Sequence, residues 1–272
     1  IVTGNNAAFL PTADQVRQAK IEGDLLHPVL LGRDFEKWMI RSTERRIIYT
    51  NGDTDLKRYP NAEKWLIPFR PVLKERRECV KGVIPWFSLQ WPRVQAELDR
   101  VPKILVQRTR NPRLATRIVA TLDADQGLYG MESIIFLVPR DSNAPVRFLL
   151  AVLNSRLINH LYATKFLNVA VKAEYLKDTP IPAAEPRDEK ALDTLARRIL
   201  EAKKSNPSAD TSTLEMEIDK IVYRLYGLTT EEIAIVEGQN AAKRPKPIAK
   251  PVKAATGRQP RKSVLTDDPD LS

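Results

Sequence analysis

The sequence predicts an α+β fold in which a mixed α/β platform precedes a helical hairpin and a disordered tail. Short β-branched and apolar runs, separated by turn residues, favour a sheet in the middle of the chain. Two amphipathic patterns after residue 182 favour helices. From residue 239 onward, Lys or Arg alternates with Pro and Ala, which leaves too little apolar surface to fold. The predicted divisions are therefore 1–182, 183–238 and 239–272.

The first hundred residues carry weaker patterns. Residues 1–10 favour a strand that runs into a turn at Gly4-Asn5-Asn6. A phosphate-binding loop is the alternative there, but the repeated glycines of such loops are missing. Gly32-Arg33-Asp34 favours a turn closed by an internal ion pair over a base-reading element. The aromatic residues between 86 and 91 are predicted to pack in the core, with stacking on bases as the alternative.

The middle of the chain has the clearest periodicity. Residues 103–106, 117–122 and 133–138 are short apolar runs separated by turn residues, and each predicts a strand. The apolar residues of 145–161 recur on one face, and Pro145 suits the first turn of a helix. We therefore expect three strands followed by one helix.

The region after residue 182 predicts a helical hairpin. Apolar residues mark one face of 192–200 and one face of 212–225, and the turn at Ser205-Asn206-Pro207 is short. Capping-box spacing at Ser212 predicts the start of the second helix, and the same spacing at Thr229 predicts a third.

The formal net charge is +10, but it is unevenly distributed. The part after residue 238 holds eight Lys or Arg and three Asp, which is half of the excess. The folded part is thus only mildly basic. The tail could add non-specific affinity for DNA or serve as a solubilising end, and the sequence favours neither.

Composition excludes several classes of protein. The single cysteine, Cys79, rules out an internal disulfide and is typical of a reducing compartment, so we expect a cytoplasmic protein. No apolar run approaches the roughly 20 residues of a membrane helix, so no membrane partner is expected. With only His27 and His160 beside that thiol, the sequence argues against a zinc site. The first residue is not Met, which suggests a piece of a longer protein.

No catalytic grouping can be assembled from the residues. Asp178 with Asp188-Glu189-Lys190 loosely mimics a nuclease metal site, but acidic residues at the start of a helix are expected anyway. There is no Gly-rich cofactor loop and no phosphate-binding loop of the Walker type. We therefore expect no catalytic residue, no metal site and no cofactor site within this chain.

An ordered set of motifs resembles a known family. The motifs are TGNNAAF at 3–9, LGRDFEKW at 31–38, PKILV at 102–106, LAVLNSRL at 150–157, PIP at 180–182, IDKIVYRLYGL at 218–228 and EEI at 231–233. In this order and spacing they resemble the TaqI-type C-terminal specificity region of adenine-specific DNA methyltransferases. The same region occurs in fused restriction–modification enzymes and phage-defence methyltransferases. The resemblance covers about residues 1–238.

The resemblance implies a division of labour. A methyltransferase domain upstream of Ile1 would bind S-adenosylmethionine and hold the flipped adenine with an Asn/Asp-Pro-Pro-Tyr/Phe motif. That motif is absent here, since Asn111-Pro112 continues with Arg-Leu, and so no catalytic residue can be carried over. The present chain would be the DNA target-recognition domain. The implied partners are double-stranded DNA, the upstream domain of the same polypeptide, and a nuclease domain or subunit.

Two loops rich in Lys and Arg supply candidate DNA contacts. Arg can read guanine with two hydrogen bonds, and Asn or Gln can read adenine. Loops 107–113 and 165–177 combine such residues. The predicted DNA-binding residues are Gln107, Arg108, Arg110, Asn111, Arg113, Arg117, Lys165, Asn168 and Lys172. A solvated charged face is the plain alternative for both loops.

Two other functions stay open on the sequence alone. The chain could be a protein-interaction subunit, with the helical hairpin as its docking face and the positive charge incidental. It could also be an enzyme in its own right, although no motif supports this.

Overall fold

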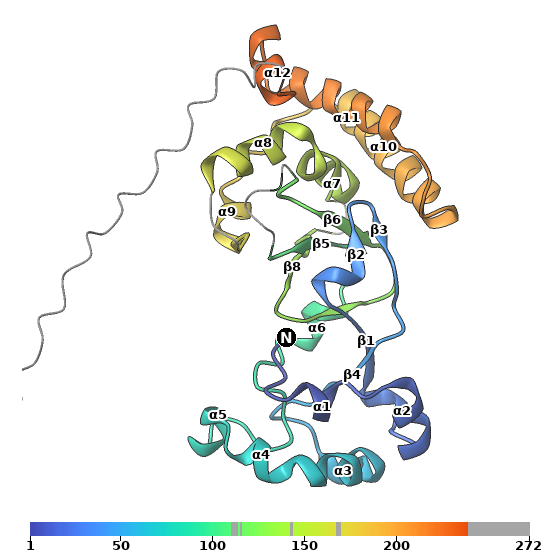
Figure 1. The fold of residues 1–272 in the computed structure, drawn as a ribbon, viewed down its shortest axis with the longest axis vertical. Coiled ribbons are helices and arrows are strands. Elements are labelled where there is room, and N and C mark those ends of the chain that lie inside the picture. The colour runs from blue at the N-terminus through green and yellow to red at the C-terminus, as the bar shows by residue number, and fades with distance from the viewer. Residues whose placement is uncertain (110–113, 115, 142–143, 167–169, 239–272) are drawn as a thin grey trace, which may run out of the picture.

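The computed structural model describes residues 1–109, 114, 116–141, 144–166 and 170–238, and it confirms the α+β class. In Figure 1, one lobe gathers α1–α5 around β1 and β4, and the other surrounds β5, β6 and β8 with α7–α12. The strands are β1 Leu26–Leu30, β2 Phe35–Glu36, β3 Met39–Ile40, β4 Arg46–Ile48, β5 Lys103–Gln107, β6 Ala120–Asp123, β7 Tyr129–Gly130 and β8 Ile134–Leu137. The helices are α1 Asn6–Phe9, α2 Ala13–Ala19, α3 Pro60–Leu66, α4 Arg70–Lys74, α5 Arg77–Val80, α6 Gln95–Leu98, α7 Val146–Asn154, α8 Arg156–Lys165, α9 Ala173–Lys177, α10 Pro186–Ser205, α11 Ser212–Leu225 and α12 Thr230–Val236.

Two of the predictions concern a membrane helix and the C-terminal tail. None of the helices in them is both long and apolar enough to cross a membrane. The tail predicted to be disordered, 239–272, lies outside the described residues.

The N-terminal lobe is built on a small mixed sheet. Strand β1 lies between β4, with which it pairs antiparallel, and β7, with which it pairs parallel. Helices α1, α3 and α4 cover this sheet and contribute Phe9, Leu66 and Leu73 to a fully buried core. Trp86 and Phe87 pack against the same core, as predicted, whereas Trp91 is half exposed.

The strand predicted at residues 1–10 is not formed. Val2 makes a single bridge to Trp91, and the chain then turns into α1. The Asn5 side chain accepts a hydrogen bond from the Ala8 amide at 3.2 Å and caps this short helix, a role for which Asn is well suited. Gly4, just before this cap, has a left-handed backbone at φ +76°, which lets the chain turn into α1. The segment is therefore a helix cap and not a hairpin turn.

The sheet of the second lobe has β5 at its centre. Strands β6 and β8 both pair antiparallel with it, which confirms the strands predicted at 103–106 and 133–138. The strand predicted from residue 117 begins only at Ala120. The amides of Arg117 and Ile118 instead donate to the side-chain oxygen of Asn159, at 2.7 and 2.8 Å.

The single helix predicted over 145–161 is two helices, α7 and α8. Ser155 breaks it, with an extended backbone at ψ 157°. The Ser155 hydroxyl donates to Val152 O at 2.7 Å and accepts from Ile158 N at 3.3 Å, so it closes one helix and caps the next. Serine often prefers such capping bonds to a helix interior, and this competition was not visible in the apolar pattern.

The neighbouring Asn154 fastens α7 to the sheet. Its side-chain amide accepts from Ala120 N at 3.1 Å and donates to Ala120 O at 3.0 Å. Both backbone groups of an edge-strand residue are thereby satisfied inside the protein. The structural role predicted for residues 153–155 fits this geometry.

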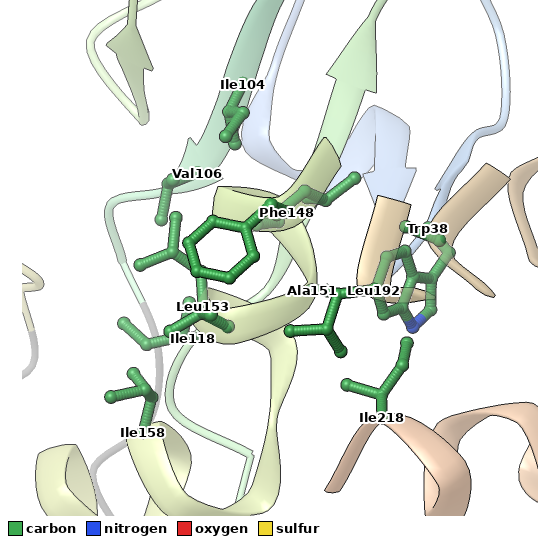
Figure 2. Packing of buried hydrophobic residues seen from close by; sticks show 14 of the residues in the cluster. Trp38, Ile104, Val106, Ile118, Phe148, Ala151, Leu153, Ile158, Leu192 and Ile218 are labelled. Carbon is green, nitrogen blue, oxygen red and sulfur yellow. The ribbon is translucent and has the colours of Figure 1, made fainter. Parts of the chain in front are cut away.

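The C-terminal helices share a core with the sheet. Figure 2 shows Leu192 of α10 and Ile218 of α11 beside Trp38 and Ala151. Contacts between α10 and α7 are among the most extensive in the fold, and the same buried cluster includes Ile104 of β5. This buried cluster therefore includes residues on both sides of the boundary predicted at residue 182.

Local signals place the ends of α11 and α12. Thr229 and Glu232 form the predicted capping box at the start of α12. Helix α11 begins at Ser212, the residue predicted to cap it, because the capping position is Thr211, one residue earlier. It ends at Leu225, before Gly227 at φ +66°. In Figure 1, α10 and α11 lie side by side, as a hairpin requires.

Candidate nucleic-acid interface

The two basic loops predicted from the sequence meet at one place. Thr109, just after β5, forms an antiparallel bridge with Ala170. Val171 N donates to Arg108 O at 2.7 Å, and Arg108 N donates to Ser133 O at 2.8 Å. The backbone therefore ties the start of the first loop to the second loop and to the turn between β7 and β8.

Arg108 is exposed beside an open hollow of about 580 Å³. One of its guanidinium nitrogens donates to Glu132 O at 3.3 Å, which holds the side chain near the rim. Lys172 lines the same hollow from the second loop. The hollow lies between α9 and α6, and β8 contributes Ile135 and Phe136 to its wall. Two of the predicted DNA-binding residues thus share one surface.

The ends of the second loop rest on an aromatic pair. The rings of Phe166 and Tyr175 are stacked, with centroids 4.0 Å apart and planes 13° from parallel. The Lys165 ammonium lies 5.6 Å from the Phe166 ring, and the Lys172 ammonium lies 5.5 Å from the Tyr175 ring. Both lysines are exposed. The stacked rings hold the two lysine side chains in place at the surface. Both ammonium charges remain available to a ligand.

Gln107 and Arg117 belong to the interior instead. The Gln107 amide donates to Gly32 O at 2.6 Å and to Phe35 O at 2.8 Å. Arg117 is 1% exposed, and one guanidinium nitrogen lies 3.4 Å from Phe166 O. Side chains held in this way cannot reach a base edge without breaking internal bonds. The sequence could not reveal this, because the partners named here lie 49, 72 and 75 residues away along the chain.

The remaining predicted residues lie outside the described part of the chain. These are Arg110, Asn111, Arg113 and Asn168. They stay predictions, and the described residues on either side show only where the two loops begin and end.

Arg33 is an exposed cation that was not among the predicted DNA contacts. The turn Gly32-Arg33-Asp34 does form, but the ion pair of Asp34 is with Arg45, at 3.6 Å, and not with Arg33. The Arg33 side chain makes no hydrogen bond or ion pair with the described residues. It lines a second hollow, of about 550 Å³, together with Thr109 and Ser133.

Arg93 is another exposed cation, on the rim of the larger hollow. Its backbone has φ +69°, a left-handed conformation that costs a residue with a side chain about 1 kcal/mol or more. The Tyr49 hydroxyl donates to Arg93 O at 2.7 Å and helps to hold this conformation. A strained residue that carries an exposed charge beside a hollow is a common feature of functional sites. Only the Pro92 before it signals an irregular backbone in the sequence.

The exposed charge on this face is mixed. Arg33, Arg93, Arg108, Lys165 and Lys172 bring positive charge to the joined loops and the two hollows. Glu97, Glu132 and Glu174 line the larger hollow as well. Such a surface can contact phosphates through its cations and still offer hydrogen-bond acceptors. Among the described residues, no three His, Cys, Asp or Glu side chains gather as a metal site would require.

Comparisons with known proteins give a match at the level of structure. No family model matches the sequence, and no curated protein matches it. Among solved structures, the chain is similar to the type IIL restriction–modification enzyme MmeI, which was determined in complex with DNA. The match has a TM-score of 0.61 and 14% sequence identity, and it covers 89% of this chain.

The likeness defines the class of fold. The described chain has the fold of a segment of a restriction–modification enzyme. It spans about a third of that enzyme, since the match covers 34% of the MmeI chain. The TaqI-type relationship inferred from the motifs is more specific than this shared fold, and it stays a prediction.

Proposed function

We propose that this chain is the DNA target-recognition region of a restriction–modification system. In the finer form of the proposal, it serves a site-specific adenine-N6 DNA methyltransferase of the TaqI-type group. It would bind double-stranded DNA and position it for a catalytic domain of the same polypeptide. A nuclease domain or subunit would be a further partner.

One observation carries the proposal. Two basic loops, more than fifty residues apart in sequence, are joined through the Thr109–Ala170 bridge into one exposed surface. That arrangement lets cations from both loops contact one duplex, where phosphate contacts set the register and base contacts give the sequence preference. The fold shared with part of a DNA-complexed restriction–modification enzyme supports the same proposal.

The cofactor would belong to the upstream domain. S-adenosylmethionine supplies the methyl group when it is bound there. No residue of this chain is assigned to it, because the resemblance covers the specificity region and not the domain that would bind the cofactor. The residues described above would bind and orient the duplex.

The docking-subunit alternative loses its main support in the structure. It needs the apolar face of the helical hairpin for a partner. Leu192, Leu195 and Ile199 of that face are buried against the rest of the second lobe. The hairpin is thus part of the core of this chain, and its main apolar face is not exposed for docking.

Selection from a randomised pool of DNA duplexes would test the proposal. The full chain would be bound to the pool at about 50 and 200 mM salt, and the bound duplexes sequenced. We expect an enriched motif, and an affinity about 40-fold lower at the higher salt if three phosphates are contacted. A salt-insensitive interaction without an enriched motif would contradict it.

Arg108→Ala sharpens this test. We expect the variant to lose preference at one position of the motif by about 5- to 150-fold. The matched control is Arg198→Ala, an exposed arginine on α10, which Figure 1 places on the other side of the lobe from α9. The control should leave the motif unchanged.

A further inference from the structure

The turn between β7 and β8 presents an acid on a fixed backbone. Met131 N donates to Leu30 O, and Ile134 N donates to Met131 O, both at 3.0 Å. Met131 and Ile134 are buried, whereas Glu132 between them is exposed. The turn therefore holds the Glu132 side chain at the surface with little freedom in its backbone.

Glu132 is a neighbour of Arg108. The Arg108 guanidinium donates to Glu132 O at 3.3 Å, and the Arg108 amide donates to Ser133 O at 2.8 Å. Both residues line the larger hollow, and both are exposed. A donor group and an acceptor group are thus presented side by side, from two elements that are bonded to each other.

The other two acids of the hollow are each favoured by a helix N-terminus, whereas Glu132 has only the charge of the Ile1 ammonium in the same hollow. Glu97 and Glu174 each lie in the first turn of a helix, α6 and α9, where negative charge is favourable. Glu132 lies in a turn, and its carboxylate makes no hydrogen bond or ion pair with another described residue. Beside phosphates, such a carboxylate would only be repelled. Its position suits a ligand that brings a hydrogen-bond donor.

We propose that Arg108 and Glu132 together read one G·C base pair in the major groove of DNA. Arg108 would donate to O6 and N7 of guanine, and Glu132 would accept from the N4 amino group of cytosine. Among base pairs, G·C presents two acceptors on one base and an amino donor on the other at these positions. The inference rests on the proposed function and names the chemistry of its specificity.

A cycle that pairs a protein change with a base change tests it. The motif enriched by the full chain is rebuilt with a cytosine analogue that lacks the N4 amino group, at each G·C pair in turn. For the unchanged protein, we expect one position at which the analogue lowers affinity by about 5- to 150-fold. For Glu132→Ala, the analogue should cost nothing further at that position. Both side chains involved are exposed, so a thermal melt should show no change in folding.

The matched control is Glu97→Ala, which removes another exposed acid from the same hollow. It should raise affinity for all sequences alike, because it only removes repulsion from phosphates, and it should keep the full penalty of the analogue. If Glu132→Ala also keeps that penalty, or if the enriched motif contains no G·C pair, the inference is overturned while the recognition function stands. If the unchanged chain enriches no motif, the proposed function fails and the inference fails with it.

Discussion

The two ends of strand β5 carry cations in opposite environments. At the start of the strand, Lys103 and Asp123 are both 0% exposed, with the ammonium 3.2 Å from the carboxylate. Just past its end, Arg108 is exposed beside an open hollow. The two residues are five positions apart, and their charges are equal. Burial alone makes one a structural group and leaves the other available to a ligand.

The buried end is stabilised by a complete set of partners. Asp123 also accepts from Gln126 N at 2.9 Å and from Leu128 N at 2.6 Å. Lys103 donates to Leu98 O as well. Burial lowers the pKa of the Lys103 ammonium, and the nearby Asp123 carboxylate opposes that shift. A charge pair in this setting is costly to break, because either partner left alone would be an uncompensated buried charge.

Asp123→Ala should therefore produce the largest effect. It leaves Lys103 buried without its counter-ion, and we expect the free energy of unfolding to fall by about 3–5 kcal/mol. Chemical denaturation followed by circular dichroism measures this. The control is Arg197→Ala, which breaks an ion pair whose side chains are 52% and 60% exposed, and should cost about 1 kcal/mol or less. Equal losses in the two variants would show that burial does not separate these charges.

Gln107→Ala tests the boundary between the two environments. Gln107 is the last residue of β5, and its removal leaves the carbonyls of Gly32 and Phe35 without their side-chain donor. We expect a loss of stability of about 1–3 kcal/mol and an unchanged enriched motif. A changed motif with full stability would instead support the base-reading role predicted from the sequence.

Local chemistry accounts for what the sequence predicted well. The apolar runs of β5 and β8, the capping box at Thr229 and the end of α11 near Gly227 all depend on residues within a few positions of each other. The meeting of the two basic loops was not predicted as such. Each loop was identified by its composition, but only the bridge from Thr109 to Ala170 puts them on one surface.

Distant partners account for what the sequence missed. Arg117, at the start of the strand predicted over 117–122, was expected to contact DNA, yet it is buried because Asn159 and Phe166 approach it from α8 and the residue that follows that helix. Glu132 is acidic and was not among the predicted DNA contacts, although it lines the same hollow as Arg108. Asp34 has a neighbouring arginine but pairs with Arg45 instead. In each case a contact that brings distant segments together decides whether a charge is structural or available.

Lys172→Ala should give the smallest effect and would refine the comparison at the exposed end. Its ammonium rests near the Tyr175 ring on the rim of the hollow. A lysine is a point charge on a flexible stem and suits a phosphate, whereas the planar guanidinium of Arg108 suits a base edge. We expect stability to change by about 0.5 kcal/mol or less. Affinity should fall evenly for all sequences, and the slope of log affinity against log salt should become shallower by about 0.9.

Lys204→Ala, which removes an exposed lysine of α10, serves as the control with an unchanged slope. A lost preference at one base position would instead make Lys172 a reader, and the distinction between the two kinds of cation on this surface would fail.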